Sequence, residues 1–214
     1  MSTADDNNGL EAPSPFTTFL KRNMQLLVVT AALVVILLFF SLAATNFADP
    51  TIYLDIVLQA AFTGVMALGA TFVIATSGID LSVGTGLSFV AVMAGIFLAG
   101  DKMNLPLGLG LLLTILVGAA VGLVNGFNVS ILGLPPFIAT LAMMMVARGL
   151  ALVISQTQSI TIKNAAYKKL ATGELIPHVA NSALIFVVLT VVATFLMNKT
   201  LLGRYALAIG SNEE

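Results

Sequence analysis

The sequence has no cysteine, no tryptophan and one histidine, and only 9% of its residues are charged, against about 25% in a typical soluble domain. The lack of cysteine excludes disulfides, thiol nucleophiles and thiolate metal sites, and a single histidine excludes a histidine-based metal cluster. So few charges cannot cover a compact core with polar surface, which argues against a soluble enzyme and a disordered chain. The net charge of −1 gives no electrostatic reason to expect a nucleic-acid partner.

Motifs for phosphate binding and hydrolysis are also lacking. The patterns G-x-x-x-x-G-K-[ST], G-x-S-x-G and H-E-x-x-H do not occur in the sequence. We therefore expect no catalytic residues, no metal and no cofactor. If ATP drives the protein, the hydrolysis must take place on another subunit.

Hydrophobic residues make up 58% of the chain, and the intervals between charges indicate where it crosses a membrane. Asp, Glu, Lys and Arg are absent from 23–48, 56–79, 81–100, 103–147 and 175–198. About 20 helical residues cross a bilayer core, so four intervals fit one span each, while 103–147 fits two spans broken at Pro135 and Pro136. The sequence predicts an all-α polytopic membrane helix bundle over residues 21–200, with about six spans near 25–47, 54–76, 82–100, 106–128, 137–155 and 179–197.

The segments that flank the spans suggest an orientation. Residues 1–20 are rich in polar residues and proline, and we expect a disordered tail there. Lys21 and Arg22 favour a cytoplasmic N-terminus, and six crossings then return residues 201–214 to the cytoplasm. Because lysines also occur in the loops on the opposite side, charge alone leaves the orientation open.

Four polar residues within the apolar regions are candidates for a pathway or a helix break. Asp80 and Ser82 interrupt an apolar stretch, where they either cap a helix, the interpretation that the sequence favours, or line a translocation path. Arg148 lies near the middle of the fifth span and must be paired or hydrated, with Asp80 or a helix carbonyl end as its candidate partner. Asn125 is expected to hydrogen-bond between helices.

Gly118, Gly122 and Gly126 form two overlapping G-x-x-x-G motifs on one helix face. Small residues allow helix backbones to approach closely in a membrane, so this face predicts tight helix packing. The alternative is that the same face slides during a conformational change.

Three strings, taken in order, resemble a known family. They are ATFVIATSGIDLSVG at 70–84, then GLVNG at 122–126 with LPPFIATL at 134–141 and ARGLA at 147–151, and finally GRYALAIGSNEE at 203–214. From about residue 20 onward the chain resembles the membrane permeases of ribose-type ABC importers of pentoses and hexoses, within a wider group that includes branched-chain amino-acid permeases. The first two strings favour the sugar branch, and an amino acid or another small solute is the alternative.

The resemblance implies a place in the bacterial plasma (inner) membrane and a set of partners. These are a separate ATP-binding subunit, a periplasmic or lipid-anchored sugar-binding protein, and a second permease chain in a homodimer or heterodimer. Transport would proceed by alternating access. The last string would open a cytoplasmic coupling loop that contacts the ATP-binding subunit through Gly210, Ser211, Asn212, Glu213 and Glu214.

Family members continue beyond the position of Glu214 with further spans, so the resemblance implies a truncated permease that is expected not to transport alone. Two other classes of function remain. A secondary carrier or channel would need no ATPase, but it would require acidic groups in the membrane for ion coupling, and only Asp80 offers one. A fragment of this kind could also be a scaffold that does not transport.

Overall fold

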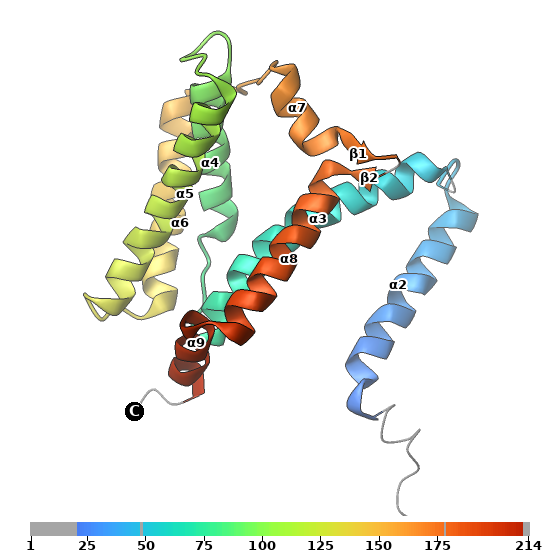
Figure 1. Ribbon diagram of the computed structural model, residues 1–214, viewed down its shortest axis with the longest axis horizontal. Coiled ribbons are helices and arrows are strands. Elements are labelled where there is room, and N and C mark those ends of the chain that lie inside the picture. The colour runs from blue at the N-terminus through green and yellow to red at the C-terminus, as the bar shows by residue number, and fades with distance from the viewer. Residues whose placement is uncertain (1–20, 48, 178, 212–214) are drawn as a thin grey trace, which may run out of the picture. The chain divides into compact units, whose positions relative to one another are not determined.

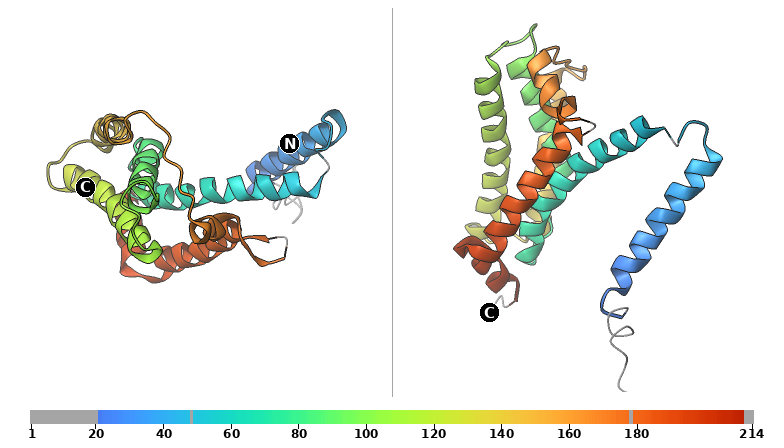
Figure 2. Two further views of the ribbon diagram at one scale, coloured as in Figure 1. Left: turned by 90° about the horizontal axis from the view of Figure 1, so that it is seen from above. Right: turned by 45° about the vertical axis from the view of Figure 1, so that its right-hand side comes forward.

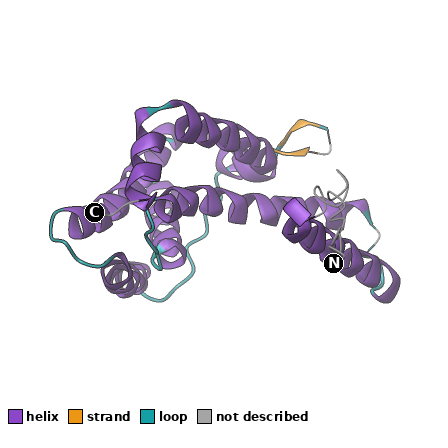
Figure 3. Ribbon diagram, turned by 90° about the horizontal axis from the view of Figure 1, so that it is seen from below, coloured by secondary structure: helices purple, strands orange, loops and turns teal. Residues whose placement is uncertain are grey.

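The computed structural model describes residues 21–47, 49–177 and 179–211, and almost all of its regular structure is helical (Figure 1). The helices are α2 (Met24–Ala43), α3 (Pro50–Ala75), α4 (Val83–Leu98), α5 (Leu107–Ser130), α6 (Pro136–Ser155), α7 (Ala165–Thr172), α8 (Asn181–Lys199) and α9 (Leu201–Ser211). The predicted all-α class is confirmed. The structure adds a short antiparallel hairpin of β1 (Glu174–Ile176) and β2 (Val179–Ala180), the only strands among the described residues (Figure 3).

A helix occupies each of the six predicted ranges, but they differ in length. By length and composition, α2, α3, α5, α6 and α8 can cross a membrane. Helix α4 has 16 residues, about 24 Å at 1.5 Å per residue, against a bilayer core of about 30 Å. It is shorter than the predicted 82–100 because the residues before Val83 form a hydrogen-bonded loop and Ala99 turns the backbone to an extended conformation, with ψ 140°.

The chain divides into two compact units, Met1–Tyr53 and Leu54–Glu214. In the first unit, aromatic rings connect the end of α2 to the start of α3. The ring centroids of Phe40 and Phe47 lie 5.6 Å apart and those of Phe47 and Tyr53 lie 5.7 Å apart. The Ser41 hydroxyl and the Tyr53 hydroxyl lie 3.0 Å apart in a hydrogen bond. Helix α2 itself buries no described residue, so its apolar surface is free to contact lipid.

In the second unit, α4 packs against both α5 and α6, and these two also contact each other (Figure 1). Helix α8 packs against α7 at one end and α9 at the other, and it runs beside α3 (Figure 2). A Cβ atom built on Gly64 of α3 would lie 2.5 Å from the Phe186 ring of α8, so the two helices touch there. This arrangement places α9, the α3–α4 loop and the α5–α6 turn at one end of the unit.

The buried face between helices consists mainly of small side chains. Helix α6 buries Ala139, Ala147 and Ala151, which repeat at helical spacing on one side, and α4 buries Ala94. Most large apolar side chains point outward instead, for example Leu123, whose side chain is 73% exposed. Small residues inside and large apolar residues outside are what a helix bundle in lipid requires.

Candidate functional site

The loop between α3 and α4 is the part of the second unit where polar groups gather. Helix α3 ends in a Schellman motif, in which Gly78 N–H donates to Val73 O at 3.0 Å and Ser77 N–H donates to Ile74 O at 2.9 Å. Ser77 occupies the left-handed position of this motif, with φ 59°. The motif turns the chain so that Asp80 and Ser82 reach α5 and α6.

Asp80, Ser82 and Asn125 form one hydrogen-bonded chain. Asp80 Oδ1 accepts from Ser82 N–H at 2.7 Å and from the Ser82 hydroxyl at 2.6 Å. Ser82 Oγ accepts in turn from Asn125 Nδ2 of α5 at 2.9 Å. Ser82 is 2% exposed and Asn125 is 8% exposed, so the bonds lie in the interior of the unit.

This chain of bonds fixes the direction of the Asn125 amide. The Ser82 hydroxyl has one proton and donates it to Asp80, so it can only accept from the NH₂ group of Asn125. The Asn125 carbonyl oxygen is buried and has no partner among the described residues. A buried acceptor without a partner costs about 1–3 kcal/mol, so this oxygen is an available acceptor for a water or another hydrogen-bond donor.

Helix α6 contributes Thr140, which bridges to the same loop. The Thr140 hydroxyl accepts from Leu81 N–H at 3.2 Å and donates to Pro136 O of its own helix at 2.8 Å. Its oxygen also lies 3.2 Å from Ile79 O. Thr140 is 4% exposed, and its hydroxyl gives the partly buried N–H group of the loop a hydrogen-bond partner. The loop is therefore held by α5 and α6 together.

Two cavities adjoin this polar cluster. One, of about 220 Å³, lies between α4 and α5 and includes Asp80, Gly118, Gly122 and Asn125 in its lining. The other, of about 260 Å³, includes Asp80, Gly122, Asn125, Gly126 and Thr140. A Cβ atom on Gly122 or Gly126 would meet nothing within 4 Å, whereas one on Gly118 would lie 3.6 Å from Val90. Within the described residues, the glycine face lines open space more than it joins helices, and its packing role stays a prediction.

The structure brings together only some of the four polar residues predicted to mark a pathway or a helix break. Asp80, Ser82 and Asn125 meet, whereas Arg148 lies on an exposed part of α6 and forms no ion pair in the described part of the chain. Of the two candidate partners of Arg148, Asp80 is therefore not bonded to it in this structure. Ser82 is the N-cap residue of α4, but its side chain makes no hydrogen bond to the helix N–H groups, whereas Asp80 accepts from Ser82 N–H at the turn before the helix. The hydroxyl is engaged by Asp80 instead.

The predicted coupling residues begin in α9, which folds back on α8 and touches the end of α3. A Cβ atom on Gly203 would meet the Met197 carbonyl group, and one on Gly210 would meet the Ala75 carbonyl oxygen. The Ser77 hydroxyl donates to Gly210 O at 3.0 Å, and the Ser211 hydroxyl donates to Ala208 O within α9. Asn212, Glu213 and Glu214 lie outside the described residues.

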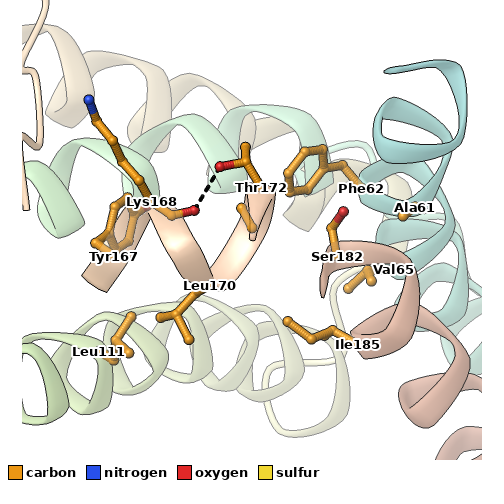
Figure 4. Close-up of a pocket in the computed structure, with 11 residues that line it drawn as sticks. Ala61, Phe62, Val65, Leu111, Tyr167, Lys168, Leu170, Thr172, Ser182 and Ile185 are labelled. Atoms are coloured by element: carbon orange, nitrogen blue, oxygen red, sulfur yellow. Dashed lines mark hydrogen bonds between the residues drawn. The ribbon is translucent and has the colours of Figure 1, made fainter. Parts of the chain in front are cut away.

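A larger apolar cavity of about 570 Å³ lies at the opposite end of the unit, where α3, α5, α7 and α8 meet (Figure 4). Its lining includes Phe62 and Val65 of α3, Leu170 of α7 and Ile185 of α8. The Ser182 hydroxyl is buried there without a hydrogen-bond partner among the described residues. Sequence analysis did not single out Ser182, Ser77 or Thr140. Ser77 and Thr140 lie within the strings that carry the family resemblance, but only the fold shows which groups their hydroxyls contact.

The chain was compared with known proteins. A family model described as the permease component of branched-chain amino-acid transport systems matches residues 52–214. The inner membrane ABC transporter permease protein YjfF of Escherichia coli is 34% identical over 90% of this chain and 59% of its own length. The ribose import permease protein RbsC of Bacillus subtilis is 35% identical over 89% and 59%. The fructose import permease protein FruF of Bifidobacterium longum is 40% identical over 70% and 42%.

The matches thus span about half of these relatives' length. No solved structure gives a significant match.

Proposed function

We propose that this chain, which belongs to the permease-component family of branched-chain amino-acid transport systems, is a membrane subunit of an ABC importer whose solute is a monosaccharide. The observation that carries the proposal is the similarity, at 35–40% identity, to relatives named as import permeases for ribose and fructose. These names favour a sugar over the amino-acid alternative. A permease is not an enzyme, and the multi-pass helices of this chain fit that role.

We assign the two ends of the second unit to opposite sides of the membrane. The end with α9 faces the cytoplasm, where a separate ATP-binding subunit contacts residues 210–214. Helix α3 ends on the cytoplasmic side, so the α2–α3 connection before it lies on the outer side. Helix α2 crosses the membrane once more, which places the N-terminus on the cytoplasmic side as well. The opposite end carries the loops 99–106 and 156–164, and faces outward.

A polar cavity at the outward end supports this placement. It has a volume of about 600 Å³ and is lined by Gly100, Asp101, Ser159, Thr161 and Lys163. Charged and hydroxyl groups at a membrane surface suit contact with a soluble protein, and we assign the partner here as a sugar-binding protein. A second permease chain completes the pathway, with Asp80, Asn125 and the glycine-lined cavities on this chain's side of it.

A recruitment assay tests the proposal directly. The chain is placed in nanodiscs and mixed with the ATP-binding subunit of a sugar ABC importer from the same genome. We expect the two proteins to elute together, and a variant that ends at residue 200 to lose the association. If the shortened variant retains the partner as well as the full chain does, the contact does not lie on α9. If neither associates, the assignment to an ABC importer fails.

The orientation has its own test, since a chain without cysteine allows single-cysteine labelling. We expect a membrane-impermeant maleimide to label Lys163→Cys in intact cells and to label Ser211→Cys only after the cells are permeabilised. Labelling of Ser211→Cys in intact cells would reverse the proposed topology.

A further inference from the structure

Ser77 has an unusual residue type for its backbone position. It lies in the left-handed conformation, with φ 59°, at the Schellman C-cap of α3, where glycine is the usual residue because it has no Cβ to crowd the backbone. At this position a serine has a steric strain between its Cβ and the backbone that a glycine would not have. Such an outlier points to a use for the side chain.

The side chain has such a use. The Ser77 hydroxyl donates to the carbonyl oxygen of Gly210 at 3.0 Å and joins two elements that are 133 residues apart in sequence. Gly210 is the point at which α9 comes closest to α3, since a Cβ atom there would meet the Ala75 carbonyl oxygen. The bond and the close backbone approach both place α9 against the end of α3 at Gly210. The Ser77 side chain is exposed, so water competes for the bond and the contact can open.

The loop that begins at Ser77 leads directly to the buried polar cluster. Within five residues, the backbone of Leu81 is held by Thr140 of α6, and Asp80 and Ser82 are joined to Asn125 of α5. A shift of α9 at Gly210 is therefore passed to α5 and α6 through one short, hydrogen-bonded segment.

We propose that Ser77 is a positioning residue, a latch that holds α9 to the α3–α4 loop so that the two move together. This proposal rests on the proposed function in one respect only, namely that a partner protein acts on α9. The latch itself is a property of this chain alone, and its test requires no partner protein.

Three substitutions of Ser77 distinguish the effect of its hydrogen bond to Gly210 from the effect of its left-handed backbone conformation. Ser77→Gly keeps, and even favours, the left-handed turn, but removes the hydroxyl. Ser77→Asn also tolerates this conformation and offers an NH₂ donor to Gly210 O. Ser77→Asp has the shape of asparagine, but when ionised it has no proton to donate. Ser130→Ala is the control, because the Ser130 hydroxyl bonds only to Gly126 O of its own helix.

Hydrogen–deuterium exchange on the full chain in nanodiscs measures the opening of α9. For peptides covering 201–211, we expect about fivefold faster exchange in Ser77→Gly and Ser77→Asp, the scale of one net hydrogen bond. Ser77→Asn and Ser130→Ala should match the unmodified chain. Unchanged exchange in Ser77→Gly, or equally fast exchange in Ser77→Asn, would overturn the latch.

The transmission along the loop is tested from the other side. Gly210→Ala places a methyl group against the Ala75 carbonyl oxygen and should push α9 away, so that exchange rises in 77–82 as well as in α9. The control is Gly69→Ala, whose Cβ would meet nothing within 4 Å. If Gly210→Ala changes α9 and leaves 77–82 unaffected, the two do not move together. The exchange experiments use no partner protein, so a failed recruitment assay would contradict the proposed function without contradicting the role of Ser77.

Discussion

At the scale of single residues, two glycines near the start of α5 have opposite surroundings. A Cβ atom on Gly110 would meet the buried side chain of Leu98 in α4, whereas one on Gly108 would meet nothing within 4 Å. We expect Gly110→Ala to destabilise the unit by about 1–3 kcal/mol, because Leu98 must leave its packed position.

Gly108→Ala should be neutral or slightly stabilising, since alanine favours helix. Thermal unfolding of both variants in the same detergent provides the measurement. Equal midpoints would mean that α4 and α5 are not in contact at Leu98.

Asp49, just before α3, gives a prediction about pH. Its Oδ1 accepts from Thr51 N–H at 2.9 Å and from the Thr51 hydroxyl at 2.8 Å, and these bonds hold the pKa of the carboxyl below its ordinary value of 3.8. Because the folded-state pKa is lowered, the stabilisation is present above the ordinary value and is lost as the pH falls through the lowered pKa. The carboxyl ¹³C shift of Asp49, assigned with Asp49→Asn, should titrate below 3.8. A midpoint at or above that value contradicts the contact.

The residue scale also shows what a sequence can and cannot predict. Asp80, Ser82 and Asn125 could be singled out because polar groups are rare in apolar segments. Their mutual contacts could not, since Asn125 is 43 residues from Ser82 and the pairing depends on how α5 packs against α4. Arg148 illustrates the converse. Its charge predicted that it would be paired or hydrated, but only the fold shows that it lies on an exposed part of α6.

At the scale of elements, Thr140 ties α6 to the α3–α4 loop. Thr140→Val keeps the shape and removes the acceptor for the partly buried Leu81 N–H, so we expect a loss of about 0.5–1.5 kcal/mol, the net value of one hydrogen bond. Thr114→Val is the matched control, since the Thr114 hydroxyl bonds only to Gly110 O of its own helix. Unfolding midpoints should fall for the first variant alone, and an equal fall in both would assign the effect to helix propensity.

The first turn of helix α7 is capped by one side chain. Asn164 Oδ1 accepts from Ala166 N–H at 2.9 Å and from Tyr167 N–H at 3.2 Å, and the helix has only eight residues. Asn164→Ala should destabilise α7 by about 0.5–2 kcal/mol and speed amide exchange over 165–172, while Asn164→Asp, which keeps an acceptor, should not. Comparable exchange in both variants would show that contacts with α8 hold α7 in place.

The elements differ in how well the sequence predicted them. Charge-free intervals located each long helix because a span needs about 20 apolar residues whatever it packs against. Helix α7 and the β1–β2 hairpin were not predicted, because they are too short to give a periodic signal. The side chain of Asn181 holds them together, accepting from Leu175 N–H at 2.9 Å and donating to Lys169 O at 2.7 Å.

At the scale of the whole molecule, the outward-facing apolar surface predicts where lipid lies. The chain has no tryptophan, so a single introduced one reports its own surroundings. Val35→Trp, at an exposed position of α2, should emit at short wavelength and be strongly quenched by lipids with brominated chains. Lys163→Trp, in the loop after α6, should emit at longer wavelength and be quenched little. Similar quenching at both positions would contradict a spanning α2.

The alanine-rich face between α4 and α6 has a consequence for motion. A methyl side chain has no rotamer to reset, so one helix can shift along the other without crossing the torsional barriers that leucine or phenylalanine would impose. Such a shift exchanges one set of weak dispersion contacts for a nearly equal set, at little change in energy. Ala94, Ala139, Ala147 and Ala151 therefore offer little resistance to such a shift, and the position of α4 depends on its polar end and on the packing of Leu98 against α5.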